Sequence, residues 1–273
     1  SLKEIVFRNE VTTIEEIAFR GCNGLSSVSL PNSVTSIGNG AFWNCKGLTT
    51  IKLGNKTASI GSFAFENCGK LASLVIPDSV ASIGSRAFSG CVSLTSIIVP
   101  SSVNDMPNDV FEGCSGIASV VLNCQNIGTW FKGSISVKEV MFGDSVRIID
   151  DNAFENCSSI ESLTIPFGVS SIGAAAFKGC SSLKNIEFNA KDCYIKNKSE
   201  SPFCILPSVE NIKFGDGVKA IPNNLTRDLE LNSITFGNNV IEIGANAFVR
   251  AKIKSVYISD ISKWCKIQLG NKE

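Results

Sequence analysis

Two stretches of the chain read almost alike. Residues 33–54 are SVTSIGNGAFWNCKGLTTIKLG, and residues 79–100 are SVASIGSRAFSGCVSLTSIIVP. Both follow the pattern V-x-x-I-G-x-x-A-F-x-x-C-x-x-L-x-x-I-x-I, and residues 57–76 between them keep the same order with Thr57 in the first position. A period of this length is the signature of a chain built from stacked supersecondary units.

A phenylalanine marks most copies of the pattern, usually 23 residues after the previous one, and Leu225 takes its place once. The members are Phe19, Phe42, Phe65, Phe88, Phe111, Phe131, Phe154, Phe177, Phe203, Leu225 and Phe248. In seven copies a cysteine follows three residues later, at Cys22, Cys45, Cys68, Cys91, Cys114, Cys157 and Cys180. With the copies at Leu2/Ile5/Phe7 and Ile253/Val256/Ile258, we count about 12 repeats.

Each part of the pattern predicts a local structure. The alternating half of L-x-x-I-x-I predicts a short strand with one buried face, and the Pro or Gly after it predicts a turn. V-x-x-I-G places two further apolar side chains inward. A-F-x-x-C has spacings near three and four, which suit a helical or 3₁₀ turn with Phe and Cys facing the core. One unit is too small to bury its own apolar face, so neighbouring units must stack.

The sequence therefore predicts a single solenoid over residues 1–260, a right-handed curved coil of ~23-residue repeats with a parallel β-sheet on one face and short β, 3₁₀ or helical turns elsewhere. The repeat is irregular at residues 117–136, where Trp130 replaces the usual Ala, and at residues 189–208. We expect the polar, lysine-rich segment Lys191–Glu200 to form a protruding loop. Residues 261–273 are either a C-terminal partial repeat or the start of a following module.

The consensus, nearly unbroken from Ser33 to Pro100, resembles the BspA-like (treponemal-type) leucine-rich repeats. The resemblance covers essentially residues 1–260. It implies an extracellular or cell-surface location and an adhesin- or receptor-like role, with a protein or glycoprotein ligand such as host matrix. The chain starts at Ser1 within the repeat pattern, without a signal peptide, so we interpret it as part of a longer protein.

Composition excludes several chemistries. The chain has no histidine, which removes Ser-His and Cys-His nucleophiles and the common zinc hydrolase motifs. The adjacent carboxylates Asp150 and Asp151 lie in a turn, and we interpret them as structural. A net charge of zero disfavours nucleic acid, and no apolar run is long enough to insert in a membrane. We predict a protein that is not an enzyme, with no catalytic residues, no metal and no cofactor.

The 11 cysteines are best explained as packing residues. Each regularly placed cysteine is alone in its repeat, whereas zinc sites need local clusters. Strand stacking spaces equivalent residues by ~4.8 Å, beyond the ~3.5–4.5 Å Cβ separation that disulfides prefer. We therefore expect reduced, buried thiols. Cys193 and Cys204 flank the extra segment and are the best candidates for a disulfide, if there is one.

Two outward columns of the predicted sheet decide the candidate site. One is small and polar and includes Ser73, Ser96 and Ser119, which we attribute to solubility and inter-strand hydrogen bonds. The next column presents four successive apolar residues, a stripe ~15–20 Å long. The hypothesis is a protein- or peptide-binding site formed by Val75, Ile98, Val121 and Met141, flanked by Lys52 and Glu187. The alternative is that β-branched residues simply suit strands.

A second function class stays open, a structural spacer or scaffold that presents another domain and has no ligand of its own. Uncapped sheet edges at the two ends of the array also predict self-association. Asn55-Lys56-Thr57 and Asn197-Lys198-Ser199 match the N-glycosylation pattern, which has little meaning in a bacterial protein.

Overall fold

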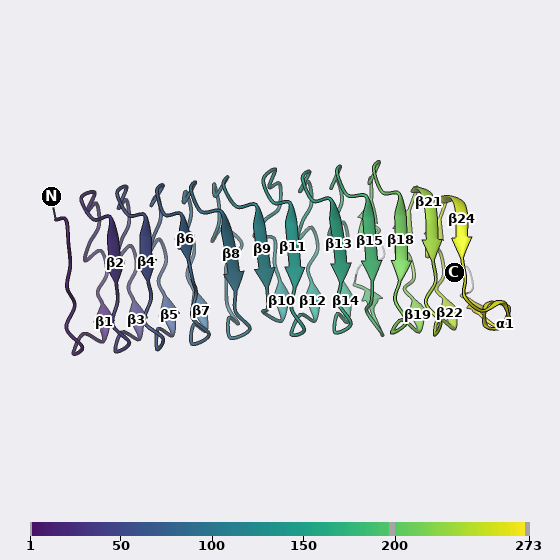
Figure 1. The fold of residues 1–273 in the computed structure, drawn as a ribbon, viewed down its shortest axis with the longest axis horizontal. Helices are drawn as coiled ribbons and strands as arrows, with labels where there is room; N and C mark the ends of the chain where they lie inside the picture. Colours follow the sequence, from purple (N-terminus) through teal and green to yellow (C-terminus); the bar gives the residue numbers. More distant parts are fainter. Residues whose placement is uncertain (1, 197–199, 271–273) are drawn as a thin grey trace. The chain divides into compact units, whose positions relative to one another are not determined.

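The computed structural model describes residues 2–196 and 200–270 and consists of stacked coils of short parallel strands (Figure 1). The second glycosylation pattern, residues 197–199, lies outside the described residues. The chain forms two compact units, Ser1–Cys124 and Gln125–Glu273, with the same coil architecture in each. The solenoid predicted from the repeat is confirmed.

The L-x-x-I-x-I segments form the strands of one face in each unit, named here the strand face. In the first unit these are β2 (Ser27–Ser29), β4 (Thr50–Lys52), β6 (Ser73–Leu74), β8 (Ser96–Val99) and β9 (Ser119–Leu122). In the second unit they are β11 (Glu139–Phe142), β13 (Ser162–Ile165), β15 (Asn185–Phe188), β18 (Asn211–Phe214), β21 (Glu230–Thr235) and β24 (Lys252–Tyr257). The paired strands are parallel, as coils that repeat in one direction require.

The described residues thus contain eleven such strands, one fewer than the repeats counted in the sequence. The first copy, Leu2/Ile5/Phe7, forms no strand, and Val6 within it is 83% exposed. This segment makes no hydrogen-bonded ladder with β2, so its backbone is not held in a regular extended register.

The V-x-x-I-G segments form a second series of two-residue strands. In the first unit these are β1 (Thr13–Ile14), β3 (Ser36–Ile37), β5 (Ser59–Ile60) and β7 (Ser82–Ile83). In the second unit they are β10 (Asn126–Ile127), β12 (Ile148–Ile149), β14 (Ser171–Ile172), β16 (Tyr194–Ile195), β19 (Ala220–Ile221), β22 (Glu242–Ile243) and β25 (Gln268–Leu269). In most of these strands the second residue is an isoleucine whose side chain is buried in the core.

The A-F-x-x-C segments are successive turns and not helices. Alternate amides bond within the turn and to the next coil: Cys45 N–H donates to the Phe42 carbonyl, whereas Phe42 N–H donates to the Ala64 carbonyl. This alternation requires left-handed backbone two residues after Phe. Gly and Asn fill that position, which is where they are tolerated best: Gly21, Asn44, Asn67, Gly90, Gly113, Gly133, Asn156 and Gly179.

Towards the end of the second unit the same segments straighten into a third series of strands, β17 (Phe203–Cys204), β20 (Thr226–Arg227) and β23 (Phe248–Val249). The one helix among the described residues is α1 (Ile261–Trp264), with Asp260 as its N-cap. No helix in residues 2–196 and 200–270 has the length and apolar character needed to cross a bilayer.

The core of each unit contains the predicted phenylalanine and cysteine columns. Phe42, Phe65 and Phe88 are completely buried, and their rings stack with centroids 5.3 and 5.5 Å apart. In the second unit Phe154 and Phe177 stack at 5.4 Å. Offset stacks at these separations are favourable beyond the area that they bury.

One position of the phenylalanine column was assigned wrongly from the sequence. Strand pairing aligns Thr226, and not Leu225, with both Phe203 and Phe248. The Thr226 hydroxyl is buried and donates to the Ala247 carbonyl at 3.0 Å. The ring of Phe214, a buried residue of β18, packs against the ring of Phe248 with centroids 6.1 Å apart, next to the coil in which Thr226 replaces a phenylalanine.

Within the predicted loop Lys191–Glu200, the described residues 191–196 differ from a protruding loop, and residues 197–199 lie outside the described part. Tyr194 and Ile195 form β16 and pair with Ser171 and Ile172, so they continue the second strand series. Lys196 pairs with Asp150 at 3.5 Å, and Glu200 with Lys178 at 2.9 Å. Ile195 lies at the position that the isoleucine of V-x-x-I-G occupies in other coils, and the segment forms a strand there although its neighbours are polar.

Candidate binding surface on the strand face

The small polar column of the strand face forms hydrogen bonds between strands. In the second unit, Asn211 Nδ2 donates to Asn185 Oδ1 at 3.0 Å, and Ser233 Oγ donates to Asn211 Oδ1 at 2.7 Å. These bonds confirm, at these positions, the predicted inter-strand role of the column. Side chains satisfied in this way contribute to the sheet more than to a ligand.

The neighbouring outward column carries the predicted apolar residues. In the first unit, Val75 is 74% exposed and Ile98 is 50% exposed. Ile98 and Val121 are register partners on β8 and β9, so they lie side by side, and Val121 is half-buried. In the second unit, Met141 on β11 is 53% exposed. None of these four side chains belongs to the buried core.

The two flanking charges differ from each other. Lys52, on β4, is exposed and has no ion-pair partner among the described residues of its unit. The carboxylate of Glu187 accepts a hydrogen bond from Lys213 Nζ at 2.9 Å, across the register pair formed by β15 and β18. Glu187 is therefore already partnered, whereas the Lys52 ammonium group is available.

The strand face is not one continuous ladder within either unit. β6 and β8 belong to different hydrogen-bonded sheets, and β11 is not hydrogen-bonded to β13. Asn123 N–H and Asn189 N–H close the ladders after β9 and β15 by donating to Val99 and Ile165. Pro100 and Pro166 occupy the same positions after β8 and β13, and proline has no N–H to donate.

A groove of about 430 Å³ lies where β11 and β13 are not paired. Its lining is Glu139, Val140, Met141, Phe142, Ser162, Thr164 and Pro166. Phe142 belongs to a column that otherwise faces the core, and its ring packs edge-on against buried Phe154 at 5.8 Å. Equivalent residues such as Leu122, Ile165 and Phe188 are completely buried, but Phe142 is only half-buried. The groove therefore reaches a core aromatic ring.

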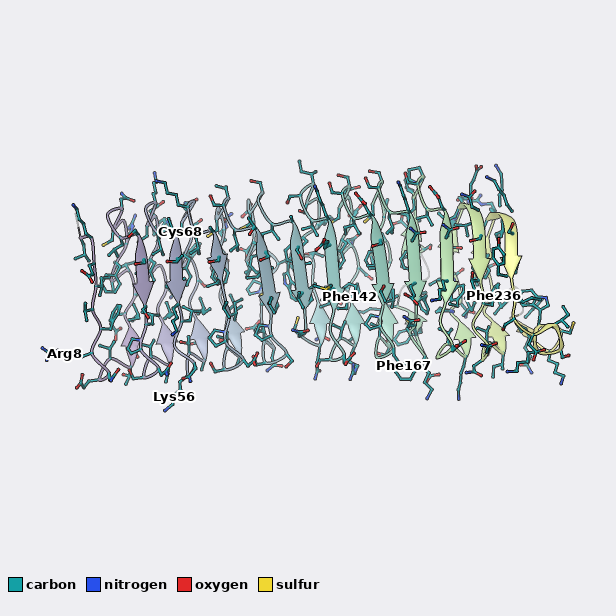
Figure 2. The ribbon with its side chains drawn as sticks, viewed as in Figure 1. Arg8, Lys56, Cys68, Phe142, Phe167 and Phe236 are labelled. Carbon is teal, nitrogen blue, oxygen red and sulfur yellow. The ribbon has the colours of Figure 1, made fainter. Side chains whose placement is uncertain are left out.

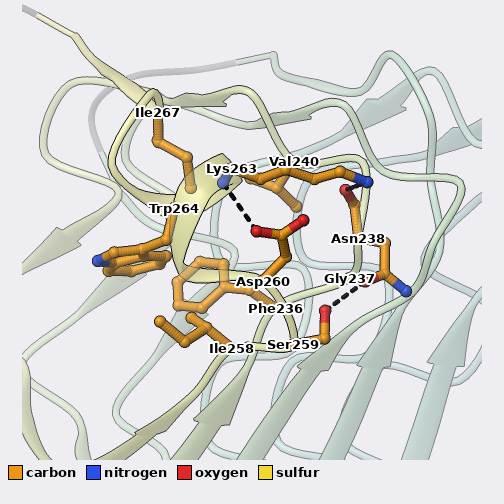
Figure 3. Close-up of a pocket in the computed structure, with 10 residues that line it drawn as sticks. All are labelled: Phe236, Gly237, Asn238, Val240, Ile258, Ser259, Asp260, Lys263, Trp264 and Ile267. Atoms are coloured by element: carbon orange, nitrogen blue, oxygen red, sulfur yellow. Dashed lines mark hydrogen bonds between the residues drawn. The ribbon is translucent and has the colours of Figure 1, made fainter.

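Two other hollows occur in the second unit. A groove of about 490 Å³ is lined by apolar residues such as Ile253 and by the ion pair of Lys252 with Glu230. A smaller cavity of about 20 Å³ lies behind α1, where Trp264 packs edge-on against Phe236 at 4.9 Å (Figure 3). That volume holds about one water molecule.

The thiols form a ladder of hydrogen bonds. Six ladder thiols, all except Cys22, donate to the carbonyl of the phenylalanine 26 residues earlier, as in Cys68 to Phe42 at 3.2 Å and Cys91 to Phe65 at 3.3 Å. All cysteines of the described residues are free, Cys193 and Cys204 included. Burial raises the pKa of Cys45 to about 11 and that of Cys68 to about 12. At neutral pH these thiols are protonated and unreactive.

The carboxylate pair considered in the sequence serves the fold. Asp151 Oδ1 accepts a hydrogen bond from Ala174 N–H at 2.7 Å, and Asp150 pairs with Lys196. Among residues 2–196 and 200–270, no group of three or more Cys, Asp or Glu side chains has an arrangement that could hold a metal ion.

The exposed columns could be predicted from the strand alternation, but the groove could not. A proline after the strand is not a sufficient signal, because Pro77 occupies the same position after β6 and β6 still pairs with β4. Pro166 and Phe142 are 24 residues apart, and neither is unusual by itself. Phe142, labelled in Figure 2, is the last residue of β11, and its exposure follows from the missing pairing with β13.

Comparison with known proteins places the chain in a family. The model of the BspA type leucine rich repeat region (6 copies) matches residues 1–118, 117–224 and 199–266. The crystal structure of the Treponema pallidum leucine rich repeat protein is 32% identical to this chain; the match covers 63% of this chain and 72% of that one, with a TM-score of 0.46. A search of curated proteins found no match.

Two further solved structures are similar over nearly the whole chain. A leucine-rich repeat protein from Bacteroides ovatus has 22% identity and a TM-score of 0.51, over 95% of this chain and 78% of that one. A leucine rich cell surface protein from Faecalibacterium prausnitzii has 21% identity and a TM-score of 0.40, over 94% and 86%. The repeat pattern, the coil architecture and the family match agree: the chain belongs to the BspA-type leucine-rich repeat family.

Proposed function

We propose that this protein is a non-enzymatic recognition module that binds a protein or glycoprotein ligand through its strand face. The observation that carries the proposal is the outward column at Val75, Ile98 and Val121, together with Met141 in the second unit. These side chains are apolar and partly or largely exposed, and they are not needed by the core. Exposed apolar side chains that lie side by side, as Ile98 and Val121 do, are typical of interaction sites.

The charges support binding to a protein more than to a polyanion. The chain has no net charge, and Lys52, which has no ion-pair partner within the described part of its unit, lies beside the apolar column. An apolar centre with a polar and charged rim is the usual composition of a protein interface. Lys52 would therefore orient a ligand whose acidic group lies beside its apolar contact.

We also propose that the module acts at the cell surface, as the family resemblance implies. A chain with many unpaired cysteines is ordinarily typical of a reducing compartment. Burial, the thiol–carbonyl hydrogen bonds and the raised pKa of residues such as Cys68 remove that objection, because such thiols do not oxidise readily. Protease treatment of intact cells tests the location: a surface protein is digested while the cells stay intact.

The binding test is a screen of the purified chain against host matrix proteins, mucins and glycans. The variant is Ile98→Lys/Val121→Lys, which places two charges in the apolar column. The matched control is Val92→Lys, because Val92 is 49% exposed but lies in a turn between Cys91 and Ser93. Circular dichroism verifies that all variants are folded.

We expect the double variant to weaken binding at least tenfold and the control to leave it unchanged. Equal binding by the double variant would reject the strand face of the first unit as the site. No binding to any ligand would favour the spacer function instead.

A further inference from the structure

The opening between β11 and β13 is the most specific binding feature of the strand face. Here, as between β6 and β8, the ladder is absent. Pro166 supplies no N–H, and at this opening Phe142 of the core column also becomes accessible. The ring of Phe142 is fixed by its contact with Phe154. In a pocket lined by such a ring, one inserted side chain typically dominates binding.

The lining defines what fits. Phe142, Val140 and Pro166 give an apolar interior, and Met141 is a flexible apolar wall that adapts its shape to what enters. Ser162 and Thr164 supply hydroxyl groups at the rim. This combination suits an unbranched or branched aliphatic side chain with polar main chain lying across the rim.

The carboxylate of Glu139 determines which charge is favoured in the ligand residue next to the inserted aliphatic side chain. Glu139 lines the groove, is exposed, and has no ion-pair partner among the described residues. The carboxylate is the one ionised group of the lining. A basic residue beside the inserted aliphatic side chain would therefore be attracted, and an acidic one repelled.

We propose that the β11/β13 groove is an anchor pocket for an extended peptide segment of a protein ligand. The segment inserts one aliphatic side chain against Phe142 and places an adjacent Lys or Arg on Glu139. The proposal rests on the proposed function, because it takes the strand face as the binding face. It adds the anchor position and the chemistry of the ligand.

A second copy of this chain is a weaker candidate occupant. The groove is a single opening between two strands, and its seven lining residues provide far less surface than the ~800 Å² per partner typical of a stable dimer. A side chain with one charged neighbour matches both the size of the opening and its single carboxylate.

The chain offers a direct spectroscopic test, because it has only two methionines. Met141 lines the groove, whereas Met106 lies in the other unit and serves as an internal reference. The full chain labelled with ¹³C-methyl methionine is titrated with the blocked peptide Ac-Gly-Ser-Lys-Leu-Lys-Ser-Gly-NH₂. Control peptides replace Leu with Ser, or both Lys with Glu.

We expect the Met141 methyl signal to shift and saturate with the first peptide, while the Met106 signal stays in place. The serine peptide and the glutamate peptide should each bind about tenfold more weakly. An unmoved Met141 signal at millimolar peptide would overturn the proposal. A shift that depends on protein concentration without peptide would identify a second copy as the occupant and overturn it as well.

Two matched variants test the position. Thr164→Trp fills the rim of the groove, and Thr235→Trp places the same side chain in the same outward column on β21, away from the groove. We expect the first to weaken the peptide at least tenfold and the second to have no effect. Glu139→Lys should reverse the preference between the lysine and glutamate peptides.

The outcome is separable from that of the proposed function. Suppose that a protein ligand binds the chain, that Ile98→Lys/Val121→Lys abolishes this binding, and that Thr164→Trp leaves it unchanged. The strand face is then the binding site, and the anchor pocket is wrong. If the peptide binds the groove while no protein ligand is found, the pocket stands and the proposed function lacks its ligand.

Discussion

A single phenylalanine of the core column contacts the coils on both sides of it. Phe65 is completely buried and stacks on Phe42 and Phe88 with interplanar angles of 4° and 3°. Neighbouring coils therefore share one side chain, and its loss leaves a cavity that neither coil closes by itself.

Phe65→Ala is expected to lower the free energy of unfolding by ~3–5 kcal/mol, because a large cavity forms in a fixed backbone frame. Chemical denaturation followed by circular dichroism measures it. Phe167→Ala is the control, since Phe167 is 58% exposed, and it should change stability by well under 1 kcal/mol. Similar losses for both variants would show that the stack is not what holds the coils.

Because of the buried thiols, the free energy of unfolding depends on pH in the alkaline range. Burial raises the pKa of Cys68 and Cys157 to about 12, from an ordinary value of 9.0. Because the folded-state pKa is the higher one, the stabilisation is complete below pH 9 and is lost as pH rises towards 12. Each such thiol then reduces stability by about 1.4 kcal/mol per pH unit.

Denaturation midpoints between pH 8 and about pH 11 test this dependence. The expected slope is smaller in Cys68→Ser, whose hydroxyl replaces one ionising thiol and can still donate to the Phe42 carbonyl. An unchanged slope would mean that the ladder thiols do not control the alkaline transition. In the native protein at pH 8, exposed Cys265 should react with a thiol reagent long before Cys68 does.

At the scale of the strands and turns, the second strand series depends on close approach between coils. A Cβ at Gly61 would lie 2.7 Å from the backbone of Gly38 and Asn39 in the preceding coil. Gly61→Ala is therefore expected to destabilise the protein by ~1–3 kcal/mol. Gly69→Ala, whose nearest contact would be an ordinary 3.7 Å, should change stability little in the same thermal or chemical unfolding measurement.

The same elements show what the sequence could and could not predict. Buried columns such as Phe42 and Cys45 follow from a fixed period, because equivalent positions in stacked coils have equivalent surroundings. Errors occur where side chains depart from the pattern. Thr226 lies the usual 23 residues after Phe203, but the apolar Leu225 beside it was assigned to the column instead. Polar composition hid the strand at Tyr194–Ile195. The apolar stripe that includes Ile98 could be predicted from the alternation of inward and outward residues. The exposure of Phe142 could not, because it depends on the missing hydrogen bonds between β11 and β13.

At the scale of the whole molecule, each coil contacts mainly its neighbours, so stability should be local. Phe65→Ala is expected to speed amide hydrogen exchange in nearby strands such as β5 and β7 of the first unit. Amides of β15 and β18 in the second unit should exchange as in the unaltered chain. Faster exchange throughout both units would instead indicate one cooperative molecule.

The thiol–carbonyl hydrogen bond has a consequence for how such proteins change over generations. Its two partners, such as Cys91 and Phe65, belong to adjacent copies of one motif, and the same pair of groups joins Cys180 to Phe154. Where copies have the full motif, unequal recombination between them deletes or duplicates a coil and recreates the same joint. Genes for this chain are therefore expected to vary in length by whole repeats, with each new length already able to fold.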